Sequence, residues 1–280
     1  MKNKEQCRYA HFDHYNCKTM EEYMGRVIAI SNQKGGVGKT TTAINLSACL
    51  AEKGKRVLTI DMDPQGNTTS GLGIDKSTVE HTSYQLLTNE TTIWEAMTPS
   101  IVPGLSVIAS ERSLAGAEIE LIGVEDREFI LKKEVDKVRD NYDFVIIDCP
   151  PSLNTLTVNA MTTADTVLVP IQCEYYALEG LSELIYTIEL VKERLNNKLE
   201  IEGVVFTMYD ARTCLSLQVV ENVKQNLHQN IYKTIIPRNV RLAEAPSHGL
   251  PINLYEPKSA GADGYRSLAD EVINRGKEEE

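Results

Sequence analysis

A glycine-rich stretch between two lysines carries the clearest chemical signal in this chain. Its residues, with the two threonines that follow, are Lys34, Gly35, Gly36, Val37, Gly38, Lys39, Thr40 and Thr41. Glycines let backbone N–H groups turn toward an anion and let phosphate oxygens approach where a Cβ would collide. We predict a triphosphate cradle in which Lys39 contacts the β- and γ-phosphates, Thr40 completes a Mg²⁺ shell and Thr41 reaches the α-phosphate. The alternative interpretation is a glycine-rich turn that binds nothing.

The start of this stretch departs from the strict P-loop pattern. Gln33 stands where that pattern has a glycine, five residues before Gly38, and Lys34 follows directly. A second lysine is not needed to hold one nucleotide within one chain, because Lys39 and the backbone amides already do so. Lys34 therefore suits a charge that is offered across an interface between two subunits.

The flanking segments predict how this loop is positioned. An apolar strand precedes it, and a helix with apolar residues at helical spacing follows it, with its positive end aimed at the bound anion. The same alternation continues to the end of the chain, so we predict an α/β fold with a doubly wound, mostly parallel sheet and helices on both faces. The expected strands are Arg26–Ile30, Val57–Asp61, Leu105–Ala109, Phe144–Asp148, Thr166–Ile171, Glu202–Phe206 and Tyr232–Ile236. The expected helices are Thr40–Glu52, Ser113–Leu121, Arg127–Asn141, Leu178–Leu195, Leu215–Gln229 and Gly264–Arg275.

Two of the expected strands end in acidic residues that point to the same site. The carboxyl ends of strands line the ligand crevice of an open parallel sheet. Asp148 fits an acid that holds Mg²⁺, and Asp63, in a loop with Gly66, is placed to orient the attacking water. Thr40, Asp63 and Asp148 form the predicted metal set. The alternative is that Asp simply favours loops after strands, and that Asp61 bonds its own turn.

Composition limits the class of protein. The formal charge is −11 over 280 residues, so no global positive field attracts nucleic acid or an anionic membrane. Six cysteines without repeated spacing, with no visible signal peptide or spanning apolar run, lead us to expect a cytoplasmic protein. We expect one ATPase domain over residues 25–280 and a poorly ordered extension over residues 1–24. In that extension Cys7, His11, His14 and Cys17 match no standard zinc finger.

Longer segments give the chain a specific resemblance. Beyond residues 34–42, 61–67 and 148–152, the stretches Pro170–Gly180 and Pro237–Gly249 are longer than any generic nucleotide motif. Together they resemble the ParA/Soj partition ATPases, which are deviant Walker A members of the MinD/ParA superfamily of P-loop NTPases. The resemblance implies ATP and Mg²⁺ as cofactors, Asp63 as the residue needed for hydrolysis, and a homodimer in the ATP state in which Lys34 contacts the partner's nucleotide. It also places Met208, Pro237 and Asn239 around adenine.

The same resemblance implies DNA binding without sequence preference, stimulation by a ParB-like partner and association with the nucleoid. Residues 203–260 carry six basic and four acidic side chains, a local charge of +2 in an acidic chain. Arg212 is the first candidate for a phosphate contact, and Lys233, Arg238 and Arg241 rank below it. The alternative for Arg212 is a surface salt bridge to an acid such as Asp210.

Two related classes are disfavoured, and one alternative stays open. The acidic end Lys277-Glu278-Glu279-Glu280 differs from a membrane-binding amphipathic helix, so we expect no membrane contact. The residues soon after Pro151 lack the cysteine that a nitrogenase-type cluster needs. The open alternative is an ATP-switched regulatory adaptor that controls a replication or transcription factor.

Overall fold

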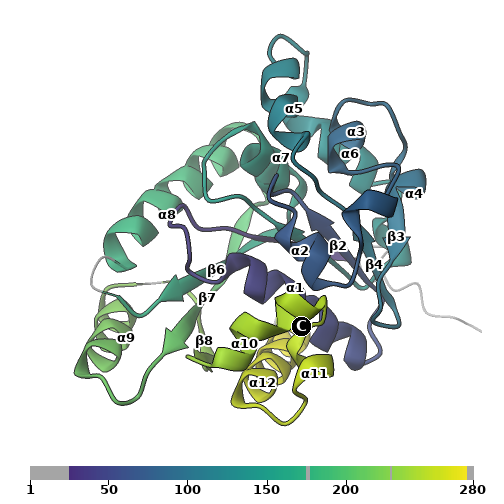
Figure 1. Cartoon of the computed structure of the whole chain (residues 1–280). Coiled ribbons are helices and arrows are strands. Elements are labelled where there is room, and N and C mark those ends of the chain that lie inside the picture. Colours follow the sequence, from purple (N-terminus) through teal and green to yellow (C-terminus); the bar gives the residue numbers. More distant parts are fainter. Residues whose placement is uncertain (1–24, 175–176, 228, 276–280) are drawn as a thin grey trace, which may run out of the picture.

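The computed structural model describes residues 25–174, 177–227 and 229–275 (Figure 1). The predicted extension, residues 1–24 with its cysteines and histidines, lies outside the described residues. Within the described part, eight strands form one sheet in the order β3-β4-β2-β5-β1-β6-β7-β8. The strands are β1 (Arg26–Ile30), β2 (Val57–Asp61), β3 (Met97–Pro99), β4 (Leu105–Ile108), β5 (Phe144–Asp148), β6 (Thr166–Gln172), β7 (Glu200–Tyr209) and β8 (Ile231–Pro237).

The sheet is parallel except at one edge, where β3 runs antiparallel to β4. Its central strands are apolar on both sides because both of its faces are covered by helices. In β5, for example, all five residues are buried, with Val145 and Ile147 in one core and Ile146 in the other. The predicted doubly wound, mostly parallel sheet is confirmed.

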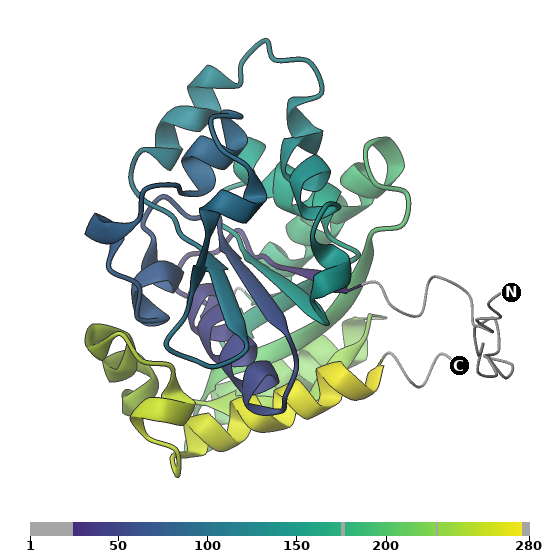
Figure 2. The ribbon, with the colours of Figure 1, turned by 90° about the vertical axis from the view of Figure 1, so that its right-hand side faces the viewer.

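Two layers of helices cover the sheet (Figures 1 and 2). The helices α1, α10, α11 and α12 supply the core on one face, while α3 to α9 supply the core on the other. The α-helices are α1 (Lys39–Glu52), α2 (Asn67–Gly71), α3 (Ser83–Leu87), α4 (Ile93–Ala96), α5 (Leu114–Glu120), α6 (Ile130–Val135), α7 (Thr155–Thr163), α8 (Ala177–Arg194), α9 (Cys214–Asn226), α10 (Val240–Glu244), α11 (Ile252–Tyr255) and α12 (Ala260–Arg275). Short 3₁₀ helices are η2 (Lys76–Thr78), η3 (Arg127–Phe129), η4 (Arg139–Asn141) and η5 (Ala245–His248).

The prediction of one of the helices is wrong. The segment Arg127–Asn141 is not one helix but three pieces, η3, α6 and η4. The backbone leaves the helix after α6 and brings Arg139 under the start of β1, where its guanidinium donates to the Gly25 carbonyl at 2.9 Å and to Asp165 at 2.8 Å. This tertiary contact outweighs the local helical pattern.

Several short elements carry no sequence signal strong enough to predict them. The strand β3 has three residues and includes Pro99. The helix α7 is rich in threonine, which has low helix propensity, yet most of its residues are buried against the sheet.

Among the residues that the structure describes, none of the helices has both the length and the apolar character needed to cross a membrane.

Candidate nucleotide-binding site

The glycine-rich loop joins the end of β1 to the start of α1, as predicted. Gly36 has φ +76° and Gly38, which caps α1, has φ +91°, a conformation that residues with a Cβ rarely adopt. A Cβ built on Gly35 or Gly36 would meet no atom within 4 Å. The loop therefore leaves open space beside its backbone, in front of the positive end of α1, where an anion fits.

Lys39 lies at the base of this open space. Its residue is only 6% exposed, and its Nζ donates to the Lys34 carbonyl oxygen at 3.1 Å. Burial lowers the pKa of Lys39, while the negative charges of Asp148 and Asp63 oppose that shift. An ammonium group has three N–H donors, so this geometry leaves Lys39 donors for phosphate oxygens.

Two hydroxyl groups converge on Asp148. Thr40 Oγ1 donates to Asp148 Oδ2 at 2.9 Å, and Thr68 Oγ1 donates to the same oxygen at 2.7 Å. Asp148 is fully buried at the end of β5, and its other oxygen, Oδ1, has no hydrogen-bond partner in the described part of the chain. A buried, orphaned carboxylate oxygen beside a threonine hydroxyl fits the donor set that Mg²⁺ prefers. Thr40 and Asp148 are thus suited to hold the metal.

A second buried carboxyl sits opposite Asp148. Asp61 is its register partner on β2, and both side chains are fully buried. Burial, followed by the negative charge of Asp61, raises the pKa of Asp148, and the two threonine hydrogen bonds only partly offset this. Burial also raises the pKa of Asp61. Without a bound cation, the pair therefore favours a protonated carboxyl.

This pair predicts a pH dependence of stability in the nucleotide-free protein. An unfolded Asp titrates near pH 3.9, whereas the raised folded pKa of Asp148 keeps its proton to higher pH. The folded state then binds a proton that the unfolded state has released, so the free energy of unfolding should fall as pH rises from about 4 through the folded pKa. The loss amounts to about 1.4 kcal/mol per unit of pKa difference.

The measurement is chemical denaturation across that pH range without nucleotide or Mg²⁺. Asp148→Asn, which cannot ionise, should show a flatter dependence than the natural chain. Parallel curves for the two proteins would contradict the assignment of this titration to Asp148.

Asp63 follows β2 at the same edge of the sheet. Its Oδ1 accepts from the Gln65 amide at 2.9 Å, and its carbonyl oxygen accepts from Ser110 Oγ at 2.8 Å. Asp61 has a different environment, because its carboxylate accepts from the Thr69 amide and hydroxyl and from the Asp63 amide. The interpretation that Asp61 bonds its own turn is confirmed, whereas the catalytic and metal roles of Asp63 stay predictions.

Lys34 is held at the surface by a residue that sequence reasoning did not assign. Its Nζ lies 2.5 Å from Glu174 Oε2, and more than a third of each side chain is exposed. The Lys34 amide donates to Asn32 Oδ1, so the backbone at this point is fixed while the side chain faces outward. Glu174 belongs to the segment Pro170–Gly180, which carries part of the family resemblance. That segment was the sequence signal that could have pointed to Glu174.

A pocket of about 510 Å³ adjoins the loop on the side of β7 and β8. It brings together Gly38 and Thr41 with the three residues predicted around adenine, which are Met208, Pro237 and Asn239. Thr207 Oγ1 donates to the Val37 carbonyl at 2.7 Å and ties β7 to the loop. Tyr265 of α12 also lines the pocket, and no motif in the sequence points to it. The largely apolar lining suits a flat aromatic base.

Of the four predicted DNA contacts, Arg212, Arg238 and Arg241 follow the carboxyl ends of β7 and β8, whereas Lys233 lies within β8. Arg212 forms two hydrogen bonds to the Asp210 carboxylate, at 2.7 and 2.9 Å, so the predicted alternative of a surface salt bridge is present. Arg238 is exposed and lies close enough to Asp210 to lower its pKa, after the larger effects of Arg212. Arg241 pairs with Glu244 at 2.7 Å. Lys233 lies toward the amino end of β8, beside Glu271.

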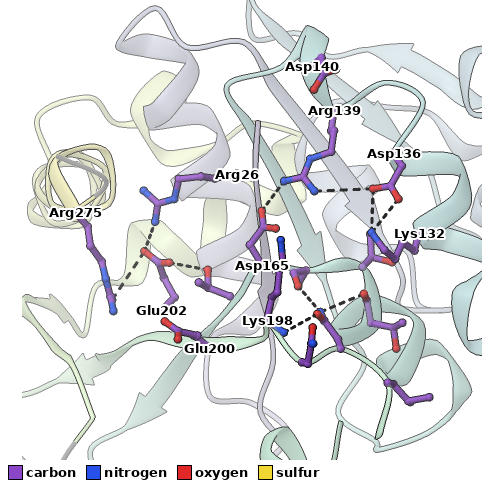
Figure 3. A pocket seen from close by; sticks show the side chains of 17 residues that line it. Arg26, Lys132, Asp136, Arg139, Asp140, Asp165, Lys198, Glu200, Glu202 and Arg275 are labelled. Carbon is purple, nitrogen blue, oxygen red and sulfur yellow. Dashed lines mark hydrogen bonds and ion pairs between the residues drawn. The ribbon is translucent and has the colours of Figure 1, made fainter. Parts of the chain in front are cut away.

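A second hollow of about 730 Å³ lies at the amino ends of the strands, on the side of the sheet opposite the nucleotide site (Figure 3). Each of its two buried charges is paired with a more exposed one: Glu202 with Arg26 at 2.6 Å, and Arg139 with Asp165 at 2.8 Å. Glu202 also accepts from Thr166 at 2.6 Å. These contacts join the starts of β1, β6 and β7, which fits a structural role rather than a nucleotide site.

Comparison with known proteins agrees with this geometry. A protein-family model described as an AAA domain matches residues 25–201. The sporulation initiation inhibitor protein Soj of Bacillus subtilis is 57% identical over 253 residues, which is 90% of this chain and all of that protein. The chain belongs to the ParA/Soj family of partition ATPases. The predicted family and the predicted ATPase class are therefore confirmed.

Two further relatives fit the same family. The chromosome partitioning protein ParA of Caulobacter vibrioides strain NA1000 is 53% identical over 252 residues, covering 89% of this chain and 94% of that protein. The solved structure of cobyrinic acid a,c-diamide synthase from Mycobacterium smegmatis, with bound ADP and magnesium, superposes with a TM-score of 0.81 at 36% identity. That likeness covers 92% of this chain and 97% of the solved one.

Proposed function

We propose that two copies of this ATPase close around two ATP molecules, bind DNA without sequence preference and release it after hydrolysis. The observation that carries the proposal is the buried Lys39 beside the Thr40–Asp148 pair, with a second lysine, Lys34, exposed at the start of the same loop. The M. smegmatis synthase that shares this fold holds ADP and magnesium. ATP and Mg²⁺ are accordingly the cofactors of this chain.

The chain's own residues divide the work of hydrolysis. Lys39 and the amides of the loop hold the phosphates, and Thr40 and Asp148 hold the metal. When bound, Mg²⁺ supplies positive charge that offsets the charge of the phosphate oxygens. Asp63 orients a water molecule toward the γ-phosphate, and the products are ADP and inorganic phosphate. Positioning and electrostatics supply most of the rate enhancement in such phosphoryl transfer.

Lys34 gives the site its dependence on a second subunit. Its exposed ammonium is free to exchange the carboxylate of Glu174 for a phosphate across a dimer interface, since an exposed ion pair contributes little stability. Loss of the γ-phosphate removes the contact that Lys34 makes across the interface, so the dimer opens after hydrolysis. A protein that works in this way acts in the cytoplasm, where it associates with the nucleoid. Residues 25–280 would then form a single ATPase domain.

Arg212→Ala is expected to weaken DNA retention by about tenfold or more at physiological ionic strength, because phosphate contacts dominate non-specific binding. ATP binding should be unchanged, since Arg212 does not line the pocket beside the loop. The measurement is filter retention or anisotropy with DNA, ATP and Mg²⁺. Arg56→Ala is the matched control, because Arg56 also forms an exposed pair, with Asp143 at 3.3 Å. Equal DNA retention by Arg212→Ala and the natural chain would remove Arg212 from the DNA surface.

One observation favours a second function. The B. subtilis relative is named as an inhibitor of sporulation initiation, which is a regulatory role. An ATP-switched adaptor of this kind would bind and control another protein, with hydrolysis incidental. Such an adaptor should keep its regulatory effect in Arg212→Ala, whereas a partition ATPase should lose DNA segregation.

The direct test is steady-state ATP turnover with DNA, with the ParB-like protein of the same genome, and with both. We expect turnover to rise about tenfold or more only when both are present, because a switch must turn over slowly until it is triggered. Turnover that ignores both additions would contradict the partition function.

A further inference from the structure

An exposed apolar surface at the end of α5 has no role in the proposed chemistry. The exposed fractions are 73% for Ile119, 68% for Ile122 and 42% for Val124, and Leu153 from the loop after β5 is 40% exposed. We call these four residues the α5 tip. Figure 1 shows α5 projecting from the top of the molecule. Large apolar side chains that gather on one projection are typical of protein interaction sites.

The two segments of the α5 tip are held together by a polar contact. Asn154 Nδ2 donates to Glu118 Oε1, which fixes the loop after β5 against α5 and places Leu153 beside it. Asn154 also caps α7, because its Oδ1 accepts from the Thr157 amide at 3.1 Å. The loop that carries Leu153 is therefore fixed against α5.

The charge around the α5 tip selects its partner. Residues 111–128 carry six acidic and two basic side chains, a net charge of −4. One of the two basic side chains, Arg127, already pairs with Glu128 at 3.0 Å. DNA and anionic membranes would be repelled, and so would a symmetric contact of this surface with its own copy. A basic segment with apolar side chains on one face is complementary in both charge and character.

We infer that the α5 tip docks a basic, amphipathic segment of the protein that stimulates hydrolysis, an inference that rests on the proposed function. The loop that contributes Leu153 begins at Asp148, five residues earlier in the chain. A partner seated on the α5 tip thus contacts the segment that leads directly from the metal-binding carboxylate. This gives the partner a physical route to the reacting phosphate without entering the nucleotide pocket.

The experiment uses the full chain and the ParB-like protein encoded in the same genome as the probe. In Ile119→Ser/Ile122→Ser, the concentration of that protein needed for half-maximal stimulation should rise about tenfold or more, since buried apolar contacts dominate such interfaces. Basal turnover, ATP-dependent DNA retention and ATP-dependent dimerisation should match the natural chain. Leu254→Ser, at a residue that is 43% exposed on α11, is the matched control and should behave as the natural chain does.

A second variant keeps the apolar residues and changes only charge. Glu125→Lys should weaken the same stimulation, and more so at low ionic strength, because it removes attraction to a basic segment. Unchanged stimulation in both variants would overturn the inference. Loss of dimerisation in the double variant would overturn it in favour of a second copy as the occupant. A natural chain that the ParB-like protein does not stimulate at all would instead refute the proposed function, and this inference with it.

Discussion

Asp63→Ala is expected to lower steady-state ATP turnover by about 10²–10⁴-fold, the usual effect of removing a group that positions or deprotonates the attacking nucleophile. Asp63 follows β2 at the nucleotide edge, where its charge acts on Lys39 and Asp148. ATP binding should persist because Lys39, Thr40 and the loop are untouched. The variant should therefore accumulate as a long-lived ATP-bound dimer, which sedimentation in the presence of ATP and DNA would reveal.

The chain offers a matched control for this change. Asp75 makes the same local contact as Asp63, since its Oδ1 accepts from the amide two residues later, Ser77, at 2.9 Å. Asp75→Ala removes that turn contact but lies in an exposed turn before η2, and it should turn over ATP normally. Normal turnover in Asp63→Ala would show that another group orients the water.

Lys34→Ala is expected to lose ATP-driven dimerisation, with an apparent dissociation constant that rises about tenfold or more. A charge-assisted contact to a phosphate across a desolvated interface is worth far more than the exposed pair that Lys34 forms with Glu174. Binding of ATP to the monomer should be nearly unchanged, because Lys34 does not line the pocket beside the loop. Analytical ultracentrifugation with a slowly hydrolysed ATP analogue and Mg²⁺ measures both quantities.

Glu174→Ala separates the two roles of Lys34. This variant breaks the same ion pair but leaves the lysine, so it should dimerise at least as well as the natural chain. Lys53→Ala, which removes a surface pair with Asp270 at 2.7 Å, controls for the loss of a lysine charge. If Glu174→Ala reproduces the defect of Lys34→Ala, the ion pair within the chain, and not a contact to the partner, explains the effect.

The phosphate end of the site could be predicted from sequence because its parts are local. Glycines, Lys39 and Thr40 lie in one segment, and Asp148 is placed beside them by a simple rule, that parallel strands end at the same edge of a sheet. The register that sets Ile30 and Asp61 level with Asp148 follows from the same rule.

Other parts of the site could not be predicted because they depend on packing between distant segments. Thr42 and Tyr265 lie 223 positions apart in sequence, yet their hydroxyls are 3.2 Å apart. The Lys34–Glu174 pair spans 140 positions, and Thr68 reaches Asp148 across 80. No local pattern encodes such contacts. The broken helix after η3 has the same origin, since Arg139 is drawn to the start of β1.

Static light scattering of the natural chain, saturated with a slowly hydrolysed ATP analogue and Mg²⁺, tests the central claim most directly. The account predicts a mass of twice the 31.2 kDa of one chain, with a return to the single-chain mass when ADP replaces the analogue. A mass of one chain with the analogue bound would contradict the account, because Lys34 would then have no second subunit to reach.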